Sequence, residues 1–332
     1  MYLRVRRRCS IEVDISSLNI LTSMDEKMNR LTSLESLKEK IYTVLRNEIS
    51  GNVCCLLDLP NYYNPGDQLI WLGDIHIVRR LSKRVVYSSS LHFFNPKMIP
   101  EGACILLQGG GGFGDLYYKH QRFREYIIQK FTKNRIIILP STVHFSTHEN
   151  LQRSVEIFSR HPDLVICARD RHSFDVLQEN FKNSRNYLIP DSAFAIDSLG
   201  CIPKRKSTEK VGPERVLFLC RRDKERSSIN EASLGFIRNI EVEDWPTQKI
   251  WRLLLHMSFL IANRILLKIF NVFGLHWNKK NDVYGLLKFH SGMRQIQDAI
   301  RLLSKYDLII TTRLHGHILA CLLNIPNILV GQ

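Results

Sequence analysis

The sequence contains no run of 18 apolar residues and no cysteine pair at the Cys-x-x-Cys spacing. Its most apolar stretch, 253–275, carries Arg264 and Lys268, each of which would cost about 2.5–3.5 kcal/mol at a bilayer centre. The basic start MYLRVRRR is followed by Glu12 and Asp14 rather than by an apolar segment. We therefore expect neither a membrane-spanning helix, nor a secretory signal, nor a structural zinc site, and we predict a cytoplasmic protein.

Acidic residues are scarce relative to basic ones. The chain has 32 Asp and Glu but 47 Lys and Arg, which gives a formal net charge of +15. This excess favours an anionic partner, which could be nucleic acid, an acidic membrane surface or a phosphorylated substrate. No nucleic-acid-binding motif is present, so no nucleic-acid partner is expected. Most of the eight cysteines lie in apolar runs and are interpreted as reduced, buried thiols.

Short apolar strands alternate with helical segments along most of the chain. This alternation predicts an α/β fold, in which parallel sheets are covered by helices on both faces. The expected strands are 53–57, 85–88, 104–107, 136–139, 164–168, 187–189, 215–220, 308–311 and 327–330. The expected helices are 34–47, 67–81, 117–131, 147–160, 172–180, 293–305 and 315–323.

The same pattern divides the chain into two halves. Residues 1–50 are expected to form a polar lead and a helix, and residues 51–203 a first Rossmann-like domain. The composition of 204–213 is typical of a linker, and 214–332 would form a second Rossmann-like domain. We therefore predict two doubly wound domains that face a cleft, where the carboxyl ends of the strands would bind ligands.

An insertion at 246–280 interrupts the second half. It contains six Lys or Arg and is rich in Leu, Ile and Phe, and much of its polar surface falls on one side of a helical wheel. Such a helix could make peripheral contact with an anionic membrane surface. It could equally pack on the second domain with a solvated basic face.

A glycine-rich segment follows the expected strand at 104–107. Gly109, Gly111 and Gly114 satisfy the pattern GxGxxG, but no acidic residue lies between 126 and 148 to bind a ribose hydroxyl. Dinucleotide binding is therefore disfavoured. Gly110, Gly111, Gly112 and Asp115 would instead form a tight turn, which could also line a sugar or phosphate site.

Polar side chains end several of the expected strands. Asn64 or Asp67 could cap the helix that follows the first strand, and both would also face the ligand edge of the sheet. Arg169 offers a guanidinium to a carboxylate or phosphate, although a salt bridge to Asp170 or Asp175 would explain it too.

Three further residues are expected at the same edge. Asp191 follows the strand at 187–189, and Arg221 begins a basic cluster after the strand at 215–220. The densest signal is the segment TTRLHGH at 311–317, between a strand and a helix. It combines Arg313, whose guanidinium can bind an anion through two hydrogen bonds, with His315, which can transfer a proton near neutral pH.

Six ordered blocks resemble the polysaccharide pyruvyl transferase family, most closely its bacterial exopolysaccharide branch. The blocks are LLDLPNYYNPGDQLIWLGD (56–74), ILLQGGGGFGDLYYKHQRFRE (105–125), IIILPSTVHF (136–145), HPDLVICARDRHSFDVL (161–177), IPDSAFAI (189–196) and LIITTRLHGHILACLLNIP (308–326). Because the blocks occur in order, the resemblance is far more specific than any one motif.

The resemblance implies a fold similar to GT-B glycosyltransferases, with phosphoenolpyruvate as donor and no obligatory metal or resident cofactor. It implies a phosphoenolpyruvate site at Arg313 and His315, to which we add Arg169 and Arg221. The first domain would bind the acceptor, through residues that include Asn64, Gly66, Asp67, Gly110, Gly111, Gly112 and Asp115. The acceptor would be a sugar. The basic insertion suggests that this sugar is lipid-linked and that the protein acts at the inner face of the cell membrane.

The resulting hypothesis is pyruvyl ketal formation on an exopolysaccharide or cell-surface glycan precursor. His315 would act as general acid, Arg313 would hold the donor, and Asp191 or Asp67 would bind or deprotonate the acceptor. The alternative is a GT-B-type glycosyltransferase that consumes a nucleotide sugar. Relatives are expected to continue beyond the final strand, so the chain is expected to be truncated at its C-terminus.

Overall fold

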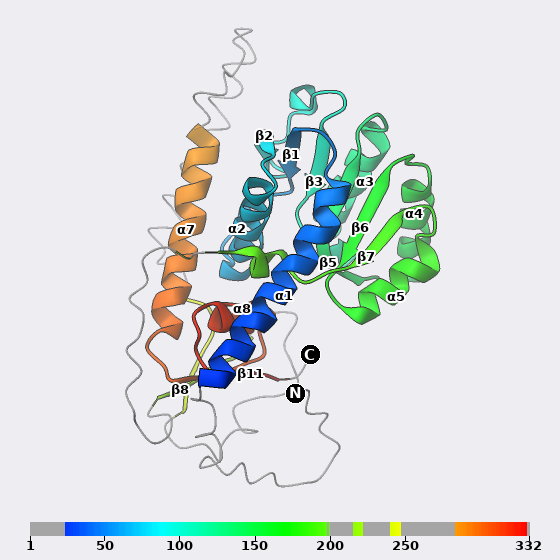
Figure 1. Cartoon of the computed structure of the whole chain (residues 1–332). Coiled ribbons are helices and arrows are strands. Elements are labelled where there is room, and N and C mark those ends of the chain that lie inside the picture. The colour runs from blue at the N-terminus through cyan, green and yellow to red at the C-terminus, as the bar shows by residue number, and fades with distance from the viewer. Residues whose placement is uncertain (1–23, 198, 200–214, 222–239, 247–282, 331–332) are drawn as a thin grey trace.

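The computed structural model describes residues 24–197, 199, 215–221, 240–246 and 283–330. At 24–32 and 283–290 it describes only the helical backbone. Two parallel sheets organise these residues, one of seven strands and one of four (Figure 1). The α/β fold with parallel sheets flanked by helices is thus confirmed. The N-terminal lead, the linker at 204–213 and the insertion after residue 246 lie outside the described residues.

The larger sheet has the strand order β2-β1-β3-β5-β6-β7, with β4 paired to β5. All of its pairings are parallel. Its strands are β1 (Val53–Leu57), β2 (Arg84–Ser89), β3 (Cys104–Leu107), β4 (Gly110–Gly114), β5 (Ile136–His144), β6 (Leu164–Ala168) and β7 (Arg185–Leu188). Its central strands β1, β3 and β6 are almost wholly buried, which explains their continuous apolar sequences.

Successive residues of the central strands pack on opposite faces of this sheet, because side chains alternate along a strand. Cys54 and Leu56 of β1 belong to a core with α1 (Met24–Glu48) and α2 (Pro65–Arg80). Cys55 and Leu57 belong to a second core with α3 (Tyr118–Lys130), α4 (His148–Ser159) and α5 (Arg171–Asn180). Both faces of the sheet are therefore covered.

The smaller sheet has the order β11-β10-β8-β9. It consists of β8 (Val216–Leu219), β9 (Ile240–Glu243), β10 (Leu308–Thr311) and β11 (Asn327–Leu329), and it packs with α7 (Val283–Leu303) and α8 (Leu314–Leu322). Its core also takes in Leu69 and Leu72 of α2, and Ala193 of the short 3-10 helix η3 (Ser192–Ala195). Helix α2 therefore belongs to the cores of both sheets.

The glycine-rich segment differs from the predicted turn. Strand β5 runs five residues beyond the expected end at 139, and its added half pairs with Gly110–Gly114 as β4. The close approach requires glycine, since a Cβ at Gly114 would lie 1.7 Å from the carbonyl oxygen of His144. Gly110 and Gly114 also have φ of 103° and 123°, in the region that favours glycine.

Three other elements differ from the predictions. Helix α1 begins at Met24, ten residues before the predicted start. Strand β9 was not expected, because its sequence IEVE alternates acidic and apolar residues at a half-exposed edge of the sheet. Helix α7 begins at Val283, ten residues before the predicted start. A second 3-10 helix, η2 (Pro96–Met98), precedes β3.

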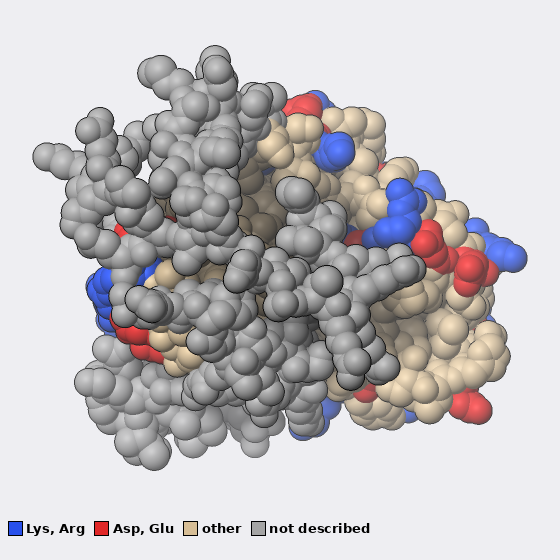
Figure 2. Space-filling model, turned by 90° about the horizontal axis from the view of Figure 1, so that it is seen from below, with Lys and Arg blue, Asp and Glu red and all other residues tan. Residues whose placement is uncertain are grey.

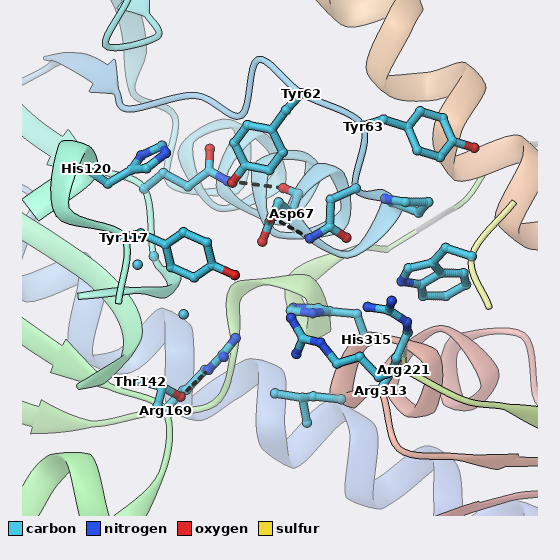
Figure 3. A pocket seen from close by; sticks show the side chains of 18 of the residues that line it. Tyr62, Tyr63, Asp67, Tyr117, His120, Thr142, Arg169, Arg221, Arg313 and His315 are labelled. Atoms are coloured by element: carbon cyan, nitrogen blue, oxygen red, sulfur yellow. Dashed lines mark hydrogen bonds between the residues drawn. The ribbon is translucent and has the colours of Figure 1, made fainter. Parts of the chain in front are cut away.

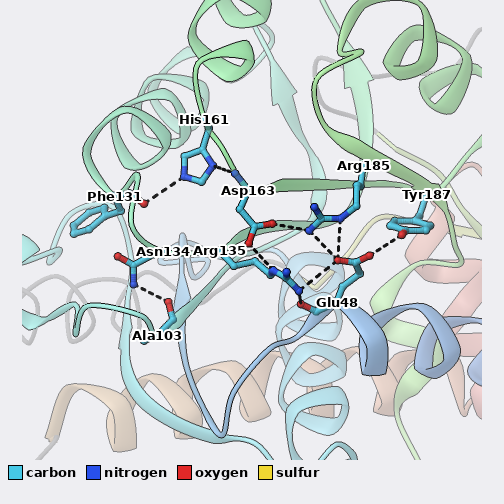
Figure 4. Close-up of polar contacts among 9 residues, drawn as sticks. All are labelled: Glu48, Ala103, Phe131, Asn134, Arg135, His161, Asp163, Arg185 and Tyr187. Atoms are coloured by element: carbon cyan, nitrogen blue, oxygen red, sulfur yellow. Dashed lines mark hydrogen bonds and ion pairs between the residues drawn. The ribbon is translucent and has the colours of Figure 1, made fainter.

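Glu48 links the C-terminal end of α1 to the larger sheet through hydrogen bonds (Figure 4). Its carboxylate accepts hydrogen bonds from Tyr187 at 2.6 Å and from Arg185 at 3.1 Å. Its backbone oxygen accepts a hydrogen bond from Arg135, which also pairs with Asp163. This network lies at the sheet edge where β5 and β7 begin.

Charges of both signs are interspersed on the described surface. In Figure 2, basic and acidic side chains of the described residues lie beside one another. The ion pairs Arg185–Asp163 and Arg160–Glu156 are two examples of such neighbours. Most of the excess positive charge falls on residues outside the described ranges. Among the described residues, no helix is both long enough and apolar enough to cross a membrane.

Asp74 of α2 is fully buried beside Ser192 of η3, and burial raises the pKa of its carboxyl well above the usual range. The folded protein therefore keeps Asp74 neutral, while the unfolded chain ionises it above about pH 4. Stability should then fall through this residue as the pH rises above that point and towards the pKa of the folded state. We expect Asp74→Asn to remove this loss, so that its advantage in Tm over the wild type grows between pH 5 and pH 8. A difference in Tm that stays constant or shrinks with rising pH would contradict a neutral Asp74.

Candidate active site

A pocket of about 600 Å³ lies where strands of both sheets end (Figure 3). Its walls come from segments that follow strands, from Gly111 and Gly112 of β4, from the second half of β5, and from residues of α2, α3 and α8. The larger sheet contributes Asp58 after β1, Gln108 and Gly109 after β3, Thr142 of β5 and Arg169 after β6. The smaller sheet contributes Arg221 after β8, Asp244 and Trp245 after β9, and Thr312 and Arg313 after β10. This position agrees with the rule that open α/β sheets bind ligands beyond the carboxyl ends of their strands.

The carboxylate of Asp191 joins the two halves of the site. Its Oδ2 lies 2.8 Å from Nη1 of Arg169 and 3.4 Å from Nε2 of His315, while Oδ1 accepts a hydrogen bond from the backbone of Ala193. Arg169 follows β6 of the larger sheet, and His315 begins α8 beside the smaller one. The side chain of Asp191 is 3% exposed, so both interactions are shielded from solvent.

The charge state of Asp191 follows from these neighbours. Burial by itself would raise the pKa of its carboxyl, but His315 and Arg169 more than offset this effect and hold the pKa well below its usual range. Asp191 is therefore a carboxylate throughout the physiological pH range. It fixes the orientation of one cation and one imidazole at the pocket wall.

The first turn of α2 packs against the imidazole of His315. Asn64 caps the helix by accepting a hydrogen bond from the backbone of Gly66 at 3.0 Å, as predicted for this position. A methyl group at Gly66 would lie 2.8 Å from Nδ1 of His315, so the position must be glycine for the ring to sit there. Asn64 also donates to Asp67 at 2.7 Å. Because Nε2 of His315 lies at Asp191, Nδ1 faces the first turn of α2. Residues of this turn also line the pocket.

Arg313 is oriented by an acidic partner that the sequence did not suggest. Its Nη2 donates to Asp244 at 2.8 Å, and its Nε donates to the other oxygen of the same carboxylate. This bidentate contact fixes the plane of the guanidinium at the pocket wall. Arg169 is held similarly, since its Nε donates to Thr142 at 2.9 Å.

The other end of the pocket contains a second histidine–aspartate pair. Nδ1 of His120 lies 2.8 Å from Oδ1 of Asp58, and the rings of Tyr62 and Tyr117 meet His120 edge-on. Arg124 lies beneath them with 1% of its side chain exposed, and it donates to the backbone oxygen of Gly112. In Figure 3, His120 and Tyr117 lie across the pocket from the arginines of the smaller sheet.

The structure brings most of the predicted site residues together. Those that line the pocket are Asn64, Asp67, Gly111, Gly112, Arg169, Arg221, Arg313 and His315. Gly66 and Asp191 stand directly behind His315, and a Cβ at Gly110 would lie 3.7 Å from Asp67. Arg169 pairs with Asp191, not with Asp170 or Asp175, the partners considered from the sequence. Asp170 instead caps α5 through Ser173.

Asp115 lies outside the pocket. Its carboxylate accepts hydrogen bonds from the backbone of Ser146 and from the side chain of Asn150, at the start of α4. Burial by itself would raise the pKa of Asp115, but these hydrogen bonds together outweigh that effect and lower the pKa. The residue connects the end of β4 to α4 and does not line the pocket between the two sheets.

Sequence reasoning missed Asp58, Tyr62, Tyr117, His120, Arg124, Thr142 and Asp244 in this pocket. Asp58 had one detectable signal, since it directly follows the buried strand β1. Among the described residues, no group of three or more His, Cys, Asp and Glu is arranged to hold a metal ion.

The fold and pocket define a two-sheet α/β protein with an arginine-rich pocket at the ends of its strands. The profile of the polysaccharide pyruvyl transferase family matches residues 64–332, and the chain belongs to this family. It is 31% identical to EpsO of Bacillus subtilis, which is named as a pyruvyl transferase, over 92% of this chain and 89% of EpsO. It is 25% identical to pyruvyl transferase 1 of Schizosaccharomyces pombe, over 87% of this chain and 69% of that protein.

The fold is similar to the crystal structure of a functionally uncharacterized protein from Klebsiella pneumoniae. The TM-score is 0.52 at 18% sequence identity, over 88% of this chain and 87% of the other. This similarity supports the α/β fold and carries no information on the reaction.

Gly66 provides a test of how the site is assembled. We expect Gly66→Ala to reduce pyruvyl transfer by about 10²-fold, because the added methyl group must displace the imidazole of His315. The midpoint of thermal unfolding should fall only modestly, because Asp191 keeps Arg169 as a partner when His315 is displaced and alanine is favourable in the first turn of a helix. The measurement is turnover together with Tm for the wild type and the variant. Turnover within twofold of the wild type would show that the position of His315 is not critical.

Proposed function

We propose that this protein transfers the enolpyruvyl group of phosphoenolpyruvate onto a sugar as a pyruvyl ketal and releases inorganic phosphate. The observation that carries the proposal is the buried carboxylate of Asp191, which orients both Arg169 and His315 at a pocket that Arg221 and Arg313 also line. Family membership supports the transferase activity. The donor and the acceptor are our proposals.

The arginines suit the two charged groups of phosphoenolpyruvate. A carboxylate and a phosphate on a three-carbon unit require several forked donors within one small volume, and Arg169, Arg221 and Arg313 all line the same pocket. Thr142 and Asp244 hold two of these guanidiniums in place before any ligand arrives. Such preorganisation lowers the entropic cost of fixing the donor.

The reaction needs an acid for the methylene carbon of the donor. Protonation of that carbon makes the adjacent carbon electrophilic, and a sugar hydroxyl can then attack it. Phosphate leaves, and a second hydroxyl of the sugar closes the ketal. In our proposal His315 supplies the proton, with Asp191 stabilising its charged form at Nε2.

Asp191 then has a different role from the one expected for it. Its oxygens are occupied by Arg169, His315 and Ala193, and it does not line the pocket. We assign it to orienting the acid and the donor cation rather than to deprotonating the acceptor. Asp67 lines the pocket and remains a candidate for contact with the sugar hydroxyls.

We further propose that the pocket is the cleft of a GT-B-like, two-domain arrangement. In this arrangement the residues from the larger sheet would face the acceptor, and those from the smaller sheet the donor, with Arg169 at the boundary. The division into domains at 51–203 and 214–332 stays a prediction, because the linker between them lies outside the described residues. The same holds for contact of the insertion at 246–280 with the inner face of the cell membrane and for a lipid-linked acceptor.

The decisive measurement is release of phosphate from phosphoenolpyruvate by the purified protein, with a panel of lipid-linked and nucleotide-linked sugars. We expect acceptor-dependent release, reduced about 10²–10⁴-fold in His315→Ala because the proton donor is removed. His172→Ala is the matched control, since His172 is exposed on α5 and outside the pocket. Its turnover should equal that of the wild type.

Two results would refute the proposal. One is normal turnover in His315→Ala, which would remove the proposed acid. The other is absence of phosphate release and of thermal stabilisation by phosphoenolpyruvate, together with consumption of a nucleotide sugar. That second result would establish the glycosyltransferase alternative.

A further inference from the structure

The pair formed by His120 and Asp58 is not used by the chemistry assigned above. His120 lies in the first turn of α3, and Asp58 directly follows β1, 62 residues earlier in the chain. Asp58 has φ of 66°, in the left-handed region of the backbone that non-glycine residues rarely adopt. A strained, buried carboxylate that faces a ligand pocket requires an explanation beyond packing.

The surroundings of Asp58 fix the orientation of the imidazole. Oδ1 lies 2.8 Å from Nδ1 of His120, and Oδ2 lies 3.9 Å from Nη2 of Arg124. Since a carboxylate accepts hydrogen bonds, the hydrogen of the neutral ring is placed on Nδ1. Nε2 then carries the free lone pair, and among the described residues no hydrogen-bond partner meets it. The ring, with its side chain 21% exposed, is thus oriented as a proton acceptor at the pocket wall.

Two tyrosines flank this histidine at the mouth of the pocket. The ring centroids of Tyr62 and Tyr117 lie 6.0 Å and 6.5 Å from that of His120, and these side chains are 44% and 39% exposed. Exposed aromatic rings beside hydroxyl-binding groups are well suited to a sugar, whose C–H faces pack on rings while its hydroxyls form hydrogen bonds. This end of the pocket therefore fits a pyranose ring better than it fits a small dianion.

Strand β4 brings the two ends of the pocket within reach of each other. A Cβ on Gly111 would lie 3.9 Å from Nη2 of Arg169, and a Cβ on Gly112 would lie 3.8 Å from Cβ of His120. Consecutive residues of one strand thus adjoin the anion-binding end and the histidine end. A sugar held near His120 would present its hydroxyls to a donor held near Arg169.

We propose that His120, oriented by Asp58, is the base that takes the proton from the attacking hydroxyl of a sugar bound between Tyr62 and Tyr117. The inference rests on the proposed function. Ketal formation removes two hydroxyl protons from the sugar, adds one proton to the donor methylene carbon and adds one to the departing phosphate. A single histidine would have to serve both the acid and the base steps on opposite sides of the reacting carbon. Two histidine–aspartate pairs divide these steps, with His315 on the donor side and His120 on the acceptor side.

The test compares His120→Gln with the wild type and with His172→Gln, an exposed control outside the pocket. At saturating acceptor, kcat should fall about 10²–10⁴-fold in His120→Gln. The KM for the acceptor should stay within about threefold, and phosphoenolpyruvate should raise the Tm as much as in the wild type. Tyr117→Ala should show the opposite pattern, with KM for the acceptor raised about tenfold and a kcat that changes little.

The outcomes separate this inference from the proposed function. A wild-type protein without acceptor-dependent turnover would refute the proposed function itself. An active wild type with His120→Gln turnover within threefold would overturn only the role of His120. The same conclusion would follow if the loss were confined to KM, or if stabilisation by phosphoenolpyruvate disappeared together with turnover.

Discussion

The site depends on one buried carboxylate that contacts two basic side chains from different parts of the chain. Asp191 would be strongly destabilising if it stood alone, because a buried charge loses its hydration. Arg169 and His315 compensate for that loss, and each is held at a defined position in return. The placement of α8 beside α2, the glycine at position 66 and the direction of Arg169 all follow from this shared contact. A site organised in this way is largely formed before a ligand binds.

Much of the fold and part of the site could be predicted because both depend on local sequence. Apolar strands such as Cys104–Leu107 are recognisable by composition, and Arg169, Asp191 and Arg313 stand immediately after such strands or close to one. The carboxyl edge of a parallel sheet then brings them together without further information. The side chains that orient such site residues could not be predicted in the same way. Nothing local connects His120 to Asp58, or Arg313 to Asp244, since these contacts span 62 and 69 residues.

Two errors have clear physical causes. The glycine run was interpreted as a turn because glycine usually ends regular structure, yet here it allows β4 to approach β5 more closely than any side chain would permit. Asp115 follows that run and was therefore expected at the ligand. Because β4 continues as a strand, it carries Asp115 past the pocket to the start of α4. Strand β9 was missed because an edge strand with alternating acidic residues lacks the apolar signature of the buried strands.

Helix α2 has a consequence for how the molecule folds. Trp71 and Ile77 complete the core of the larger sheet, while Leu69 and Leu72 complete that of the smaller one. A fragment that begins at residue 214 would therefore lack part of its own hydrophobic core. Since α2 and η3 supply part of the core of the smaller sheet, we expect the two sheets to unfold as one cooperative unit although they are separate in hydrogen bonding. The chain order of synthesis suits this dependence, since α2 leaves the ribosome long before β8.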